Sequence, residues 1–142
     1  TTMVQFPDGL PILSFEHRLR SRYSETDKMG YVYYGRYLEY FEEARTEMIR
    51  SMGVRYSTME KDGIMLPVIH SEIDYKHPLY YDEEILIKVL VYTVPSVTLV
   101  TYYEVIAQER DQLCALGEVS LVFMSSVTRK PCRAPKYLLE AL

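Results

Sequence analysis

The sequence predicts an α+β fold in which one long helix packs against an antiparallel sheet of about five strands. Two features support this prediction: a single long stretch with helical periodicity near residue 40, and several strand-like stretches joined mostly by short polar turns. Consecutive strands with short connections pair as an antiparallel meander. A helix placed before them can then cover one face of the sheet.

The first strand is expected over residues 15–23, where alternate residues share one face and charged residues lie mainly opposite. The shared face consists of Phe15, His17, Leu19, Ser21 and Tyr23. Residues 24–30 are polar and turn-forming, whereas residues 31–35 are too aromatic for an ordinary surface loop. We expect the functional site in this segment, between the first strand and the long helix.

From about Gly35, apolar residues recur every three or four positions, which is the spacing of one helix face. They are Tyr37, Phe41, Ala44, Met48 and Met52, widened by Leu38, Tyr40 and Ile49. The pattern predicts a helix of roughly 17 residues, with Gly53 as its left-handed cap. A short helix over residues 56–61 and strands over 69–77, 85–92, 97–106 and 113–124 should follow, with Pro78 breaking the second strand.

Composition excludes several classes of protein. The 142 residues are 48% hydrophobic and contain no repeat or linker, so we expect one domain over residues 1–142. A net charge of −4 argues against a nucleic-acid partner. Apolar runs are far shorter than the ~20 residues of a membrane span and no signal peptide is evident, so we expect a cytoplasmic protein. Two cysteines and three scattered histidines predict no metal site.

Asp27 is the carboxylate placed between a strand and the start of the long helix, among several tyrosines. A carboxylate in half-apolar surroundings can act as a general base or a nucleophile. The unpaired N–H groups of the first helical turn can stabilise an oxyanion beside it. An aspartate at such a place also commonly caps a turn, so residue types alone leave both roles open.

Residues 23–45, from Tyr23-Ser24-Glu25-Thr26-Asp27 to the helical Phe41-Glu42-Glu43-Ala44-Arg45, resemble the opening signature of the 4-hydroxybenzoyl-CoA thioesterase family. Weaker matches at 66–68, 75–79 and 117–119 extend the resemblance from about residue 15 to residue 135. The resemblance implies a hot-dog fold, in which a sheet wraps around one helix. It also implies hydrolysis of acyl-CoA thioesters without a cofactor, in a dimer or larger homo-oligomer whose subunits share the substrate.

The resemblance implies roles for individual residues. Asp27 falls on the catalytic aspartate and Gly30 on the glycine that follows it. Tyr33 and Tyr34 are the aromatic pair before the helix, and the Tyr34 backbone N–H is expected to polarise the thioester oxygen. Many relatives carry histidine where this chain has Tyr34, and a tyrosine is no base near neutral pH. Tyr23 falls on a residue that orients the aspartate in some members; its alternative role is a packed aromatic.

Contacts with the phosphates of CoA are expected from a basic cluster after the last strand, Arg129, Lys130 and Arg133, with Lys136 beside it. The alternative for these residues is a solvated basic tail. Ser96, in the turn between two central strands, aligns roughly with a region that contacts CoA in relatives. His70 and His77 fall on opposite faces of one strand and are expected to be structural.

Two other functions stay open at this point. A hot-dog protein can act as a dehydratase or only bind acyl-CoA or an acyl carrier protein, although no histidine lies within residues 23–34 for a dehydratase to use. The 14 tyrosines would also suit a non-catalytic interaction module in which Asp27 only caps a turn.

Overall fold

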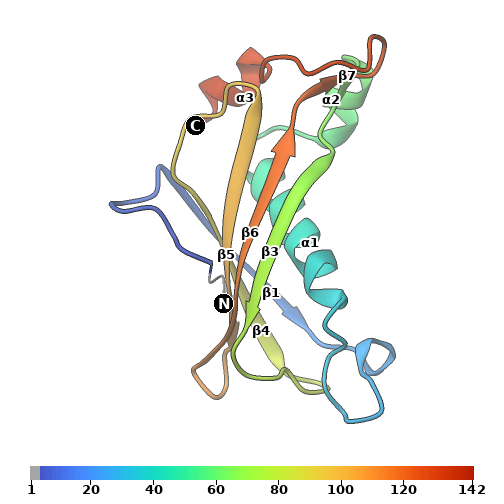
Figure 1. Ribbon diagram of the computed structural model, residues 1–142, viewed down its shortest axis with the longest axis vertical. Helices are drawn as coiled ribbons and strands as arrows, with labels where there is room; N and C mark the ends of the chain where they lie inside the picture. The colour runs from blue at the N-terminus through green and yellow to red at the C-terminus, as the bar shows by residue number, and fades with distance from the viewer. Residues whose placement is uncertain (1–3) are drawn as a thin grey trace.

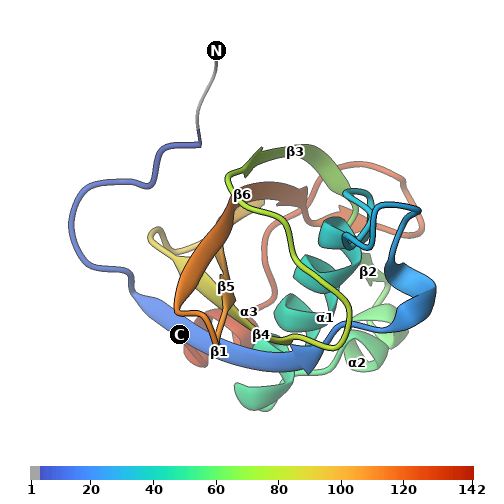
Figure 2. The same cartoon turned by 90° about the horizontal axis from the view of Figure 1, so that it is seen from below.

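The computed structural model describes residues 4–142 and confirms the α+β prediction (Figure 1). A five-stranded antiparallel sheet has the order β1-β4-β5-β6-β3. Its strands are β1 (Leu13–Arg20), β3 (Val68–Tyr75), β4 (Glu84–Val91), β5 (Thr98–Ala107) and β6 (Gln112–Val122). Figure 2 shows the sheet curving around helix α1 (Arg36–Ser51), with β1 and β3 as the two edges.

Smaller elements close the end of the molecule near the carboxyl end of α1. Helix α2 (Tyr56–Lys61) has the predicted bounds. The sequence patterns did not reveal β2 (Ile64–Met65) and β7 (Met124–Ser125), which pair with each other, or helix α3 (Lys136–Glu140). Among residues 4–142, no helix combines the length and apolar character needed to cross a bilayer.

Six of the eight residues predicted for the apolar helix face are buried; the exceptions are Leu38 and Met52, which is only partly buried and lies just after α1. Tyr37, Tyr40, Phe41, Ala44, Met48 and Ile49 all face the sheet. Leu38, predicted to widen this stripe, is instead 43% exposed, because the sheet contacts only one side of the first turn. After the helix, Gly53 has a φ of +83°, so the predicted left-handed cap is present.

The first strand ends earlier than predicted. Phe15, His17 and Leu19 alternate as expected, but β1 stops at Arg20 and Tyr23 begins a single turn of 3-10 helix, Tyr23–Glu25. The chain turns because the Ser21 hydroxyl donates to the Tyr80 carbonyl oxygen, 2.5 Å away, and the Glu25 carboxylate accepts from the Arg22 amide. Tyr23 is 77% exposed, so the prediction that it continues the strand face is wrong.

The Phe41 side chain of α1 reaches the sheet at Gly117 of β6. Gly117 lies beneath the Phe41 ring, and a β-carbon at this position would overlap that ring. Phe41 also stacks on Tyr103 of β5, with ring centroids 4.2 Å apart. The absence of a side chain at Gly117 therefore sets the distance between helix and sheet.

A buried series of hydrogen-bonded side chains lies under helix α1. The Arg45 guanidinium donates to the Tyr103 hydroxyl over 2.9 Å, and that hydroxyl lies 2.5 Å from the Thr101 hydroxyl. Burial raises the pKa of Tyr103, so the ring keeps its proton and links the two side chains. Arg45 of the helical motif is thus a core residue that joins α1 to β5.

Candidate active site

Asp27 lies in a tight turn between the 3-10 turn and α1. Its amide donates to the Tyr31 carbonyl oxygen over 2.8 Å, and the Gly30 amide donates to the Asp27 carbonyl oxygen over 3.1 Å. Gly30 has a φ of +81°, which explains a glycine at this position. The Asp27 carboxylate oxygen Oδ1 accepts from the amides of Met29 and Tyr31, at 2.9 and 3.2 Å.

The capping and chemical roles of Asp27 are compatible in this geometry. Oδ1 is held by two backbone amides, while Oδ2 accepts no hydrogen bond from any residue within 4–142. Two N–H donors on one oxygen fix the orientation of the carboxylate. The side chain therefore presents one anchored oxygen and one oxygen free to act on a substrate or a water molecule.

Asp27 lines an open cleft of about 330 Å³. The cleft is formed by the loop before α1, the first turn of α1, and the end of β3 with the residues that follow it. Its remaining lining residues are Tyr31, Val32, Tyr34, Tyr37, Tyr75, Lys76, His77 and Pro78. A carboxylate, one primary amine and one imidazole thus share a cavity with largely aromatic walls.

Three of the cleft tyrosines form a continuous aromatic wall. The Tyr75 ring meets Tyr37 edge-on at 5.1 Å and Tyr34 edge-on at 6.3 Å, and its hydroxyl donates to the Tyr34 carbonyl oxygen over 3.1 Å. Burial raises the pKa of both Tyr37 and Tyr75. These phenols are therefore neutral hydrogen-bond donors near pH 7 and do not act as bases.

The start of α1 offers two free backbone donors. The amides of Arg36 and Tyr37 are used within the turn, by the carbonyl oxygens of Tyr33 and Tyr34. By contrast, the amides of Tyr34 and Gly35 donate to no acceptor in the described part of the chain. They lie at the positive end of the helix dipole, beside the Asp27 cleft.

Gly35 and Tyr33 pack tightly in this turn. A β-carbon on Gly35 would lie only 2.8 Å from Cε2 of the Tyr33 ring, so a side chain at position 35 would displace that ring. The Tyr33 ring also packs at a tilt of 39° against the Tyr34 ring, with centroids 4.6 Å apart, and a hydrogen bond with the Tyr34 side chain raises the pKa of Tyr33. The aromatic pair of the sequence motif thus packs beside the helix start.

Several predicted site residues lie elsewhere in the chain. Tyr23 and Asp27 do not share a cavity: Tyr23 lines a separate hollow of about 700 Å³ with Tyr40 and Tyr81, and its ring packs edge-on against Tyr81. Ser96 lies between β4 and β5, where its carbonyl oxygen accepts from the Ala134 amide over 2.6 Å.

The basic cluster also lies far from Asp27 within one chain. Arg129, Lys130 and Arg133 follow β7, at the opposite end of α1 from the Asp27 turn (Figure 1). A 16-residue helix spans roughly 24 Å. One subunit therefore does not bring the predicted phosphate contacts to the predicted catalytic residue.

Sequence reasoning missed the place of Lys76 and His77 in the cleft. His77 was expected to be structural, but it lines the same cleft as Asp27. The amides of Lys76 and His77 hold this segment in place by donating to the Cys114 carbonyl oxygen, over 2.8 and 3.1 Å. The available signal was Pro78, which follows β3 and lines the same cleft as Asp27.

One group of side chains has the composition of a metal site. His70 and Glu72 of β3 and Glu118 of β6 bring potential ligand atoms within 4.8 Å of one another, and no other such group occurs in residues 4–142. Glu72 and Glu118 pair directly across the strands. The group faces away from α1, because Tyr75 and Gly117, which contact the helix, have the opposite parity on their strands. It therefore lies outside the Asp27 cleft.

Comparison with known proteins agrees with this architecture. Residues 21–142 match the thioesterase-like superfamily. A Bacillus subtilis protein, YneP, named as a candidate acyl-CoA thioesterase, is 50% identical over 62 residues, which cover 44% of this chain and 45% of that protein. The chain thus spans about half the length of this relative. The acyl-CoA thioester hydrolase YbgC of Escherichia coli is 26% identical over 88% of this chain and 92% of its own length.

A solved structure supports the same assignment over most of the chain. The DHNA-CoA thioesterase of Staphylococcus aureus has a TM-score of 0.82 and 35% identity, covering 87% of this chain and 83% of that one. The curved sheet around α1 is the hot-dog arrangement that the resemblance implied. The chain is a hot-dog protein and belongs to the thioesterase-like superfamily.

Proposed function

We propose that this protein hydrolyses acyl-CoA thioesters to a free acid and CoA. The observation that carries the proposal is the Asp27 carboxylate, which is anchored through Oδ1 and free at Oδ2, in a cleft next to two unpaired amides. Thioester hydrolysis needs a base or nucleophile and donors for the oxyanion, and the cleft offers both. The relatives' names support the same reaction.

In the proposed reaction, the substrate carbonyl lies between Asp27 and the start of α1. Oδ2 either removes a proton from a water molecule that attacks the carbonyl carbon, or attacks that carbon itself to give an anhydride that water then hydrolyses. The carbonyl oxygen gains negative charge and accepts from the amides of Tyr34 and Gly35. Collapse breaks the carbon–sulfur bond and releases the CoA thiolate. Neither route requires a metal or redox cofactor.

The β3 edge supports the proposed homo-oligomer. β3 pairs with β6 on one side only, and at its two ends Val68, Ile69 and Tyr75 are each about half exposed. An eight-residue edge strand with exposed apolar side chains is a ready site for pairing with another chain. We propose that two subunits pair their β3 edges antiparallel across a two-fold axis.

This pairing would reconcile the basic cluster with the cleft. β3 runs from the β2–β7 end of the molecule at Val68 to the Asp27 end at Tyr75. Antiparallel pairing therefore sets the β2–β7 end of the partner subunit against the Asp27 end of the first. Arg129, Lys130 and Arg133 would then bind the CoA phosphates of a substrate whose thioester lies at Asp27 of the other subunit.

The proposal is tested by release of thiol from a panel of short-chain, long-chain and aromatic acyl-CoAs, including 4-hydroxybenzoyl-CoA, together with acyl carrier protein thioesters. Rapid hydrolysis of one class would support the proposed activity and identify the substrate. Hydrolysis of carrier-protein thioesters alone would mean that the substrate is an acyl carrier protein thioester and not an acyl-CoA. No release from any thioester would favour a binding protein or interaction module.

Removing the three basic residues is expected to weaken substrate binding selectively. The triple variant Arg129→Ala, Lys130→Ala, Arg133→Ala should raise KM for an acyl-CoA by about 10- to 100-fold with little change in kcat, because exposed charge-assisted contacts are lost. The matched control is the corresponding acyl-pantetheine, which lacks the nucleotide phosphates. The assigned phosphate contacts would be contradicted if KM rose equally for both substrates, or if it rose for neither.

A further inference from the structure

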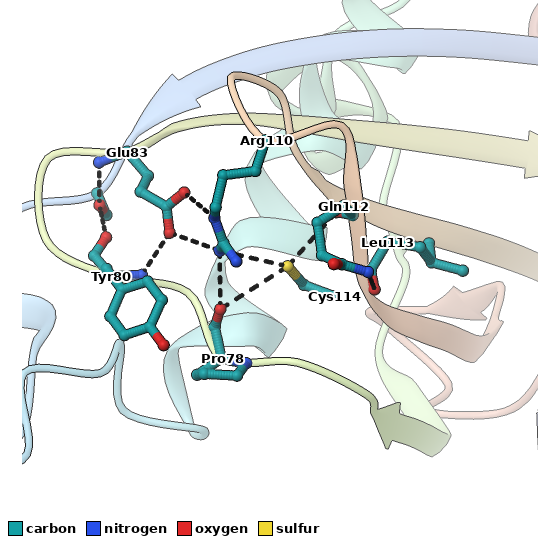
Figure 3. Close-up of polar contacts among 8 residues, drawn as sticks. Pro78, Tyr80, Glu83, Arg110, Gln112, Leu113 and Cys114 are labelled. Atoms are coloured by element: carbon teal, nitrogen blue, oxygen red, sulfur yellow. Dashed lines mark hydrogen bonds and ion pairs between the residues drawn. The ribbon is translucent and has the colours of Figure 1, made fainter.

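A network of polar contacts lies at the end of the sheet nearest the cleft, around the turn between β5 and β6 (Figure 3). Arg110 in this turn donates from Nε and Nη2 to the two carboxylate oxygens of Glu83, over 2.9 and 2.8 Å. Nη2 also donates to the Pro78 carbonyl oxygen over 3.0 Å. The guanidinium carbon lies 5.1 Å from the centre of the Tyr80 ring.

The partners of Arg110 belong to one loop, residues 78–83, between β3 and β4. The Glu83 side chain is only 14% exposed, and its Oε1 also accepts from the Tyr80 amide over 2.7 Å. The Ser21 hydroxyl closes the loop, because it accepts from the Glu83 amide and donates to the Tyr80 carbonyl oxygen. Arg110 thus holds the beginning, middle and end of this loop in one geometry.

The same loop supports the Asp27 turn. The Val32 amide donates to the Leu79 carbonyl oxygen over 2.8 Å, and Tyr31 forms a backbone bridge with Tyr80. The rings of Tyr31 and Tyr80 also meet edge-on at 5.4 Å. Tyr31 in turn makes two hydrogen bonds with Asp27, one to its carboxylate.

We propose that Arg110 is a positioning residue for Asp27. By clamping residues 78–83, it fixes Tyr31 and hence the orientation of the Asp27 carboxylate, without touching the substrate. This inference rests on the proposed function for its effect on rate. Its effect on the conformation of the Asp27 turn is independent of that function. A bidentate guanidinium–carboxylate pair with a backbone and an aromatic contact defines one loop conformation, which a lone surface ion pair does not.

The test compares Arg110→Gln with Arg20→Gln. Arg20 is a matched control because it lies at the same end of the molecule and binds the same loop, through the Asp82 carbonyl oxygen, but contacts neither Pro78 nor Tyr80. Amide hydrogen exchange of residues 27–33 is the first measurement, since it needs no substrate. We expect exchange there to become about tenfold faster in Arg110→Gln and to stay unchanged in Arg20→Gln.

The second measurement is kinetic. For an acyl-CoA that the wild type hydrolyses, Arg110→Gln should lower kcat by about 10- to 100-fold with KM changed less than about threefold, because a misplaced carboxylate reduces the rate of reaction but not binding. Arg110→Lys should recover only part of this loss, since an ammonium cannot form the bidentate pair. Glu83→Gln serves as the second variant if Arg110→Gln does not fold.

Unchanged exchange in residues 27–33 in the Arg110 and Glu83 variants would overturn the proposal, as would an unchanged kcat. A wild type that hydrolyses no thioester would refute the proposed function alone, and the exchange measurement would still decide the role of Arg110.

Discussion

Replacing Asp27 with asparagine is expected to lower kcat for thioester hydrolysis by about 10²- to 10⁴-fold. The asparagine side-chain oxygen can still accept from the amides of Met29 and Tyr31, so the turn keeps its hydrogen bonds. What disappears is the negative charge and basicity at Oδ2, on which both the base and the nucleophile mechanisms depend. Steady-state kinetics on the best acyl-CoA of the panel measure the effect.

Asp82→Asn is the matched control for this experiment. Asp82 also lies in an exposed loop and has a φ of +61° that asparagine tolerates; within residues 4–142 its side chain forms only an exposed ion pair, with Arg20. Its variant should keep wild-type activity, and circular dichroism should show both variants folded. Activity preserved in a folded Asp27→Asn would remove Asp27 from the chemistry and leave it the role of turn cap.

Replacing Gly117 with valine is expected to destabilise the fold by about 3 kcal/mol or more. Even the first carbon of a side chain at this position would overlap the Phe41 ring, which is itself stacked on Tyr103 and fully buried. Helix α1 must then move away from β6, and the core loses contacts along the length of the helix. The midpoint of urea unfolding measures the change.

The control for that experiment is Ser120→Val on the same strand. Ser120 has the opposite parity to Gly117 and therefore points away from α1, where a β-branched residue suits a strand. We expect little change in its unfolding midpoint. A Gly117→Val protein as stable as the wild type would mean that the spacing between helix and sheet adjusts without cost.

The sequence alone determined the features that depend on neighbouring residues. Periodicity identified α1 and its buried face, including Phe41 and Met48, because a helix that packs on a sheet must repeat apolar residues every three or four positions. The same local signals located the turn that holds Asp27 and the left-handed cap at Gly53. The family signature in that segment then identified the hot-dog fold.

Other features were decided only by contacts between distant segments. Tyr23 was assigned to a strand because its alternation continued, but Ser21 bonds to Tyr80, 59 positions away, and turns the chain first. His77 reaches the Asp27 cleft, and Arg110 reaches Glu83, only because the sheet order brings their loops to one end. Local periodicity indicates which face of a helix or strand is buried, whereas strand order and loop contacts depend on pairing between distant segments of the chain. The tertiary structure therefore decided which side chains surround Asp27 and placed β3 at an edge of the sheet.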